Sequence, residues 1–109
     1  KENFAPVDSR ALLERVASLA IAEWSYRGEA DRHVGPIAED FKAAFGLGGD
    51  ERYIGAVDAD GVALVAIQGL NAKLEAKVAE QAREIAELRR VVNELLARGA
   101  NDARVAISR

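Results

Sequence analysis

The chain has 109 residues, of which 50% are hydrophobic, 30% are charged and only 6% are aromatic, and its formal net charge is -3. This length fits a single domain, the hydrophobic content excludes disorder throughout, and interspersed charges leave no basic patch for nucleic acid. Without cysteine and with one histidine, the chain excludes disulfides and thiolate metal sites and cannot supply several imidazoles for zinc, so we expect no cofactor.

No apolar run reaches the roughly 20 residues of a membrane span, so we expect no membrane partner. The chain begins at Lys1 without a methionine or a signal peptide. We therefore expect it to be a fragment, a processed product or the ordered part of a longer protein.

The first predicted element is a helix from about Ser9 to Leu19. Its start is indicated by Pro6 and by a cap candidate at Asp8 or Ser9, and apolar residues then recur at helical spacing. The alternating segment that follows predicts a strand, which Gly28 ends.

A polar loop and a short extended piece at His33–Val34 come next. Pro36 fits the first turn of a second helix, since its missing N–H costs nothing there. Phe41 and Phe45 share one face of that helix with Ile37 and Ala44, and the "GLGG" that follows stops it. "YIGAVDADGV" then suggests a short strand with Asp60-Gly61 as a turn.

A seven-residue repeat marks the segment 62–98, which contains no proline and only Gly69 as a breaker before Gly99. Apolar residues recur at the first and fourth positions of about five heptads, as in a coiled coil. We call this set the seam: Leu64, Asn71, Val78, Ile85 and Val92 at position a, and Ile67, Leu74, Gln81, Leu88 and Leu95 at position d. A predicted helix of about 36 residues, about 54 Å long, is too long for the small N-terminal part to cover.

The seam therefore predicts self-association, with the number of strands left open. Val or Ile at a with Leu at d favours two strands, whereas the apolar flanking positions favour three or more. Those flanking residues are Ala63, Leu70 and Val91 at g, and Ala82 and Leu96 at e. Asn71 and Gln81 add polar layers that fix register. Glu84 and Arg89 could pair between parallel helices, and on balance we favour a trimer.

The predicted fold is mostly α with a small β element. A small N-terminal α+β subdomain, residues 1–61, precedes a long C-terminal helix, residues 62–98, that forms a homotrimeric parallel coiled coil. Gly99 ends this helix, and residues 99–109 form a loose tail or a short added strand.

Five other features admit a structural and a functional interpretation. His33 has no nucleophile or orienting partner nearby in the sequence, so a surface or interface position is favoured over catalysis. Glu39 and Asp40 follow Pro36, where stabilising the helix dipole is favoured over acid-base work, although a Glu39 role in orienting a cleavage site stays open. "DADG" could suggest a calcium site, but it lacks the other ligands of an EF-hand loop, so a turn is favoured. "GLGG" could suggest phosphate binding, but it lacks the lysine-serine pair of a P-loop. Trp24 and Tyr26 fit core or trimer contacts, or contacts to a client.

Three segments in order carry a family resemblance: "KENF", "HVGPIAEDFKAAFGLG" and "YIGAVDADGVALVAIQGLNAKL", followed by the coiled coil. They resemble the intramolecular chaperone, or peptidase S74, domain of phage tail spikes and tail fibres, as in the endosialidase tail spike. The resemblance covers Lys1–Arg98. It implies a homotrimer that assists folding of the upstream fibre or spike domain of the same polypeptide, in the host cytoplasm during virion assembly.

The resemblance also implies autoproteolysis at the N-terminal boundary, after which the domain is released. The family's motif has the form Ser-Asp-x-x-x-Lys-x-x, and "KENF" matches its end, so Lys1 stands at the catalytic lysine and the serine would lie five residues upstream. A lysine can activate a serine when desolvation lowers its pKa. An N→O acyl shift and direct attack on the preceding carbonyl are both open. The precursor would be a single-turnover Ser-Lys endopeptidase, whereas the chain as given lacks the serine.

Two alternatives remain at this point. One is a non-cleaving structural trimerisation foot of a fibrous protein, which would use the same seam. The other is a processed domain of a membrane-bound transcription factor, which a flanking DNA-binding domain or transmembrane helix would reveal.

Overall fold

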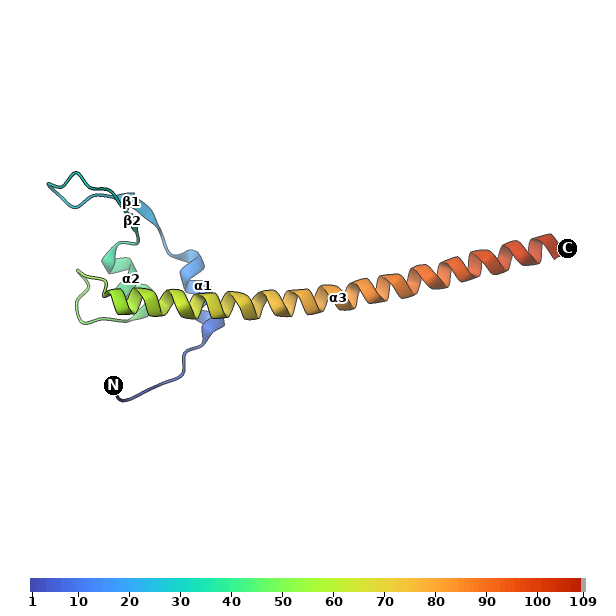
Figure 1. Ribbon diagram of the computed structural model, residues 1–109, viewed down its shortest axis with the longest axis horizontal. Helices are drawn as coiled ribbons and strands as arrows, with labels where there is room; N and C mark the ends of the chain where they lie inside the picture. The colour runs from blue at the N-terminus through green and yellow to red at the C-terminus, as the bar shows by residue number, and fades with distance from the viewer. Residues whose placement is uncertain (109) are drawn as a thin grey trace. The chain divides into compact units, whose positions relative to one another are not determined.

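The computed structural model describes residues 1–108, which form three helices and a two-stranded sheet in the order α1, β1, β2, α2, α3 (Figure 1). Lys1–Lys73 form one compact unit, and the described residues 74–108 belong to a second unit and are helical. The prediction of a mostly helical protein with a small β element and a long C-terminal helix is confirmed.

Helix α1, Ser9–Ser18, begins where its sequence predicts. The carboxylate of Asp8 accepts from the backbone N–H groups of Arg10 and Ala11, at 3.1 Å each. These bonds satisfy two of the N–H groups that a helix start leaves without intrahelical partners. Asp8 is therefore the cap.

Strands β1, Ala22–Trp24, and β2, His33–Gly35, pair antiparallel, with Glu23 opposite Val34. The predicted strand is confirmed but stops at Trp24, short of Gly28. The indole Nε1 of Trp24 donates to the carbonyl of Gly35 at 3.2 Å. Gly28, in the connection between the strands, has φ of 80°, a region that favours glycine. The two strands and their connection are called the hairpin below.

Helix α2, Ala38–Phe45, follows directly, with Ile37 at the N-cap. The prediction that Pro36 lies in its first turn is wrong, because Pro36 precedes the cap in extended backbone. Glu39 and Asp40 do lie in the first turn, and Gly46 ends the helix in the left-handed conformation with φ of 65°. Left-handed backbone at this position is the common way to end a helix, and glycine adopts it without a Cβ clash.

Helix α3, Ala56–Ser108, is longer at both ends than its sequence predicts. The predicted strand and Asp60-Gly61 turn are wrong, because both residues lie inside the helix, and the segment 53–55 before it is not a strand. The prediction that Gly99 ends the helix is also wrong. A helical glycine costs only about 1 kcal/mol relative to alanine, and alanines at 97, 100 and 103 offset that cost. Residues 99–108 are helical rather than a loose tail, and residue 109 lies outside the described part.

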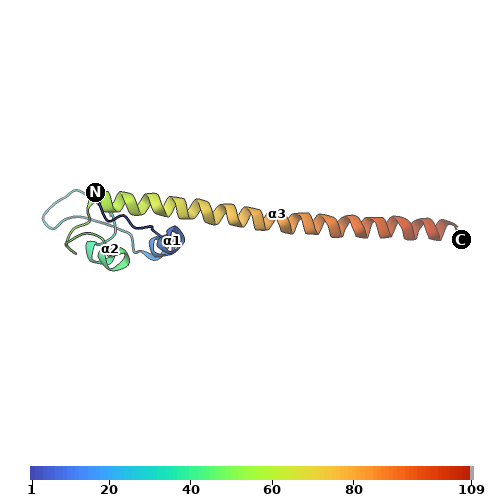
Figure 2. The same cartoon turned by 90° about the horizontal axis from the view of Figure 1, so that it is seen from below.

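The core of the first unit is small. It consists of Leu12 from α1, Phe41 from α2, and Val62 and Ala66 from α3, with Leu13, Val16, Leu19, Phe45, Ile54 and Val65 packed against it. Figure 2 shows α1 and α2 on the same side of the first turns of α3. At Gly69 the approach is closest, since a Cβ there would lie 2.4 Å from the carbonyl oxygen of Ser9.

Candidate functional site

The seam of α3 is exposed to solvent along its whole length in the single chain. Its apolar members are each between 50% and 65% exposed, although large aliphatic side chains usually lie inside proteins. These residues are Leu64, Ile67, Leu74, Val78, Ile85, Leu88, Val92 and Leu95. An exposed apolar surface of this extent is typical of an interaction site.

The core and the seam use opposite faces of α3 within the first unit. Val62, Ala66 and Gly69 are buried and recur at spacings of four and three residues, so they share one face. Leu64 and Ile67 are displaced from that face by about half a turn, because successive residues are about 100° apart. Docking of α1 and α2 therefore leaves the seam uncovered.

The positions beside the seam widen its apolar surface. Leu70, Val91 and Leu96 are 46%, 37% and 66% exposed, and Ala63 and Ala82 are also exposed. Both polar seam residues, Asn71 and Gln81, are exposed as well. The apolar surface is thus wider than positions a and d alone, and a wider apolar face is more typical of bundles of more than two helices.

The second unit carries two short ion pairs, which lie away from the seam. Arg90 pairs with Glu87 and with Glu94, at 2.6 Å each, across one turn of the helix. The hydrogen bond from Arg90 lowers the pKa of Glu87. All three side chains are more than half exposed, so these pairs add little stability. They place charged side chains on the face of the helix away from the apolar seam.

The predicted catalytic lysine lies in an exposed arm. Residues 1–8, which we call the arm, have no regular secondary structure, and all of them are exposed. Phe4 is 84% exposed and Val7 57%. The single chain does not surround Lys1 with apolar groups, so the desolvation that a lysine base needs would have to come from the upstream segment or from further copies.

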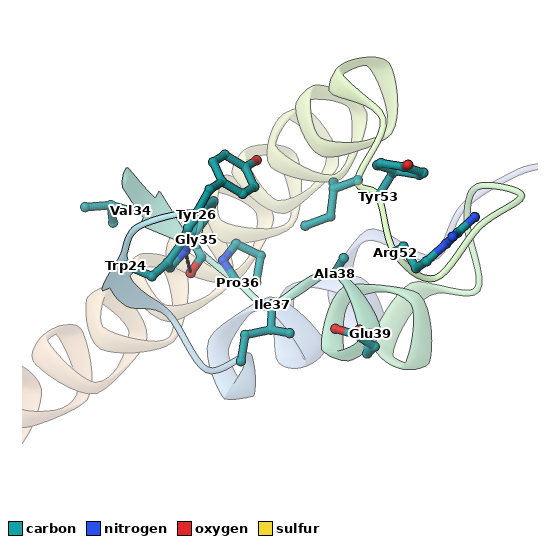
Figure 3. Close-up of a pocket in the computed structure, with 11 residues that line it drawn as sticks. Trp24, Tyr26, Val34, Gly35, Pro36, Ile37, Ala38, Glu39, Arg52 and Tyr53 are labelled. Atoms are coloured by element: carbon teal, nitrogen blue, oxygen red, sulfur yellow. Dashed lines mark hydrogen bonds between the residues drawn. The ribbon is translucent and has the colours of Figure 1, made fainter. Parts of the chain in front are cut away.

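An open groove lies between the hairpin and the start of α2. Its volume is about 470 Å³, and its lining includes Tyr26, Val34, Ile37, Glu39, Arg52 and Tyr53. Figure 3 shows Tyr26 and Tyr53 on opposite sides of it, with Pro36 and Ile37 between them. The sequence did not predict this groove, because its lining comes from three separate segments that only the folded chain brings together.

An aromatic cluster on the hairpin accounts for three of the singled-out residues. Trp24, Tyr26 and His33 have ring centroids 4.9 to 5.3 Å apart. His33 is exposed on the strand opposite Trp24, which agrees with the predicted surface position. Trp24 is half-buried and Tyr26 is 57% exposed, so neither is a core residue of the single chain.

Asp58 and Asp60, the two acids of "DADG", lie within α3. Asp58 is in the first turn of the helix, where a negative charge is favourable. Among residues 1–108, no group of three or more metal-ligating side chains comes together. No helix in this part of the chain is long and apolar enough to cross a membrane.

A small unit of two helices and a hairpin thus precedes a long helix whose apolar seam is uncovered in the single chain. Residues 1–48 match the model of the peptidase S74 family, the chaperone of endosialidase. This match confirms the resemblance over residues 1–48, which comprise the arm, α1, the hairpin and α2. Neither the curated proteins nor the solved structures contain a match to the chain.

Proposed function

We propose that the chain is a C-terminal intramolecular chaperone that trimerises and assists folding of an upstream phage tail fibre or tail spike. The observation that carries this proposal is the combination of the family match over residues 1–48 with an uncovered seam of about five heptads. The chaperone family supports an associated client. In this proposal the client is the upstream domain of the same polypeptide. Three identical copies form the assembly, and each copy contributes its three parts, 1–61, 62–98 and 99–109.

The physical basis of the chaperone action is effective concentration. Association of three parallel α3 helices brings the three chains together and sets their upstream segments in register. Tethered segments then meet at effective concentrations of about millimolar, far above those of separate chains. The entropic cost of bringing three chains together is met by the seam, before the long-range β contacts of a fibre can form.

Release would follow from Ser/Lys autoproteolysis at the N-terminal boundary. The hydroxyl of the upstream serine attacks the carbonyl before it while the amine of Lys1 takes the proton, and the peptide nitrogen then leaves protonated. Water subsequently hydrolyses the ester, which regenerates the serine. We place these events in the host cytoplasm during virion assembly.

A non-cleaving trimerisation foot is the second candidate, since the exposed seam supports it equally well. It differs from the first candidate only in that no cleavage occurs before the arm. The residues directly before Lys1 discriminate between them: Ser-Asp at the fifth and fourth positions upstream favours cleavage, and any other pair favours the permanent foot.

Sedimentation equilibrium of the chain and of two variants tests the assembly. The parent should have three times the monomer mass at micromolar concentration. Ile85→Asp puts three carboxylates into one layer of the seam and should give monomers. Ala86→Asp, the adjacent exposed residue off the seam, should leave the mass unchanged. A monomeric parent chain contradicts the proposal.

A further inference from the structure

The groove between the hairpin and α2 presents an unusual combination of apolar and charged surface. Four of its side chains are large, apolar or aromatic, and strongly exposed: Tyr26 at 57%, Val34 at 74%, Ile37 at 57% and Tyr53 at 69%. Its lining also carries one acid, Glu39, and one base, Arg52. Clefts with apolar walls and a few placed charges are typical binding sites.

The arm has the complementary combination. Phe4 is 84% exposed, more than any of those four groove side chains, and Lys1 and Glu2 supply one base and one acid. The arm also lacks regular secondary structure, so its backbone groups are not committed to a helix or a sheet. An aromatic anchor that follows a base and an acid is complementary to an apolar groove that carries an acid and a base.

The arm does not reach the groove of its own copy. Figure 1 shows the N-terminal end of the arm and the hairpin on opposite sides of the first turns of α3, and Figure 2 agrees, since the arm is in front and the hairpin is faded behind. α1 starts at Ser9 and is capped by Asp8, which fixes the end of the arm. An arm that binds in this groove would therefore come from a second copy.

We infer that in the assembled protein the arm of each copy binds in the groove of a neighbouring copy. Phe4 enters between Tyr26 and Tyr53, Lys1 pairs with Glu39, and Glu2 pairs with Arg52. Arg52 already donates to Asp50 through Nε and Nη2, and its guanidinium has further N–H groups on Nη1. This inference rests on the proposed trimer. It assigns partners to the arm and the groove of the chain that begins at Lys1. In the precursor Lys1 must be neutral to take the serine proton, so its ion pair with Glu39 forms after cleavage.

Disulfide mapping tests this directly, because the chain contains no cysteine. One chain carries Phe4→Cys and a second, longer tagged chain carries Ile37→Cys. The two are unfolded, mixed, refolded together and mildly oxidised. A cross-link between chains of different size can only come from two copies. The matched control replaces Ile37→Cys by Val57→Cys, which lies outside the groove at a site that is 83% exposed in the parent chain. We expect about tenfold more mixed cross-link with the groove cysteine.

The charges are tested in the same assay. Glu39→Lys on the groove chain should lower the yield several-fold, because it places like charges at the rim, and adding Lys1→Glu on the arm chain should restore it. A change that merely damaged the fold of α2 would not be restored.

Light scattering on the same samples separates failure of the inference from failure of the trimer. Trimers with equal cross-linking by the groove and control cysteines overturn the inference and leave the proposed function standing. In a chain that carries both Phe4→Cys and Ile37→Cys, a disulfide formed only within the same chain also overturns the inference. Monomers would overturn both.

Discussion

Gly69 lies where α3 passes closest to the start of α1. A Cβ at this position would be 2.4 Å from the carbonyl oxygen of Ser9 and 2.9 Å from its carbonyl carbon, both of them backbone atoms that a rotamer change cannot move. Gly69 is also buried on the core face of α3. Glycine is therefore required here by the approach of another backbone, although it lowers the intrinsic stability of the helix.

We expect Gly69→Ala to displace α1 from α3 and to lower the free energy of unfolding by about 1–3 kcal/mol, as overpacking does. Gly61→Ala is the matched control in the same helix, since nothing lies within 4 Å of its Cβ position. That change should raise the stability by about 0.5–1 kcal/mol through helix propensity alone. Urea denaturation at one fixed protein concentration compares them, and a neutral Gly69→Ala would contradict the close contact.

Asp50 and Arg52 form a second residue-level interaction, in the connection between α2 and α3. The side chain of Arg52 lowers the pKa of Asp50 from its ordinary value of 3.8, and the backbone N–H of Arg52 adds to this. Because the pKa is depressed in the folded state, the contribution to stability is present above pH 3.8 and is lost as pH falls through the folded pKa. The group is exposed, so the contribution is small.

Carboxyl titration by NMR checks the cause of this shift. Arg52→Ala should raise the pKa of Asp50 towards its ordinary value, because only the backbone hydrogen bond remains. Arg52→Lys keeps the charge but loses the two-pronged contact, so it should produce an intermediate pKa. An unchanged pKa in Arg52→Ala would show that the side-chain bond is not formed in solution.

At the scale of elements, local signals predicted α1 and α2 well. The cap at Asp8 depends on one carboxylate, and the left-handed stop at Gly46 depends on a residue without a Cβ, so each cause can be read from a single residue of the sequence. The predicted ends of α3 were wrong because no single residue at either position determines where the helix stops. Asp60-Gly61 and Gly99 are weak breakers, and a long helix with good helix formers on both sides passes through them.

The second apolar face of α3 was also missed. A heptad count identifies positions recurring at seven residues, and Leu64 and Ile67 fit that template. Val62, Ala66 and Gly69 fall outside it, because they pack in the core formed with α1 and α2. The docked subdomain shows that the first turns of α3 carry two faces, one packed in this core and one exposed in the single chain.

Gln81 tests the seam as an element. It occupies a d position between apolar layers, where a polar residue lowers stability and restricts register. Gln81→Leu should stabilise the assembly by about 1.5–3 kcal/mol per chain if the leucine is buried there, and should broaden the distribution of oligomeric states. Thermal melting and sedimentation measure the two effects. Ala79→Leu, exposed and off the seam, should change neither, and equal effects from both variants would contradict the seam.

At the scale of the whole molecule, one chain buries little apolar surface. Four residues form the core of the first unit, and cores of such small units rarely contribute more than about 3–5 kcal/mol. The seam, the groove and Phe4 all remain exposed. Stability and assembly are therefore coupled, and the thermal midpoint should rise with protein concentration.

The proposed release reaction belongs to the precursor in which Lys1 is preceded by its upstream residues. With the serine present five residues upstream, Lys1→Ala should leave the precursor uncleaved while trimers still form, because the seam lies in α3 and not in the arm. Lys1→Arg provides the sharper comparison. Arginine keeps the positive charge but stays protonated in proteins, so it cannot take the serine proton. Gel analysis of cleavage together with light scattering should show intact trimeric precursor for both variants. If Lys1→Arg cleaved at the parent rate, the charge of Lys1 would suffice and another group would have to be the base.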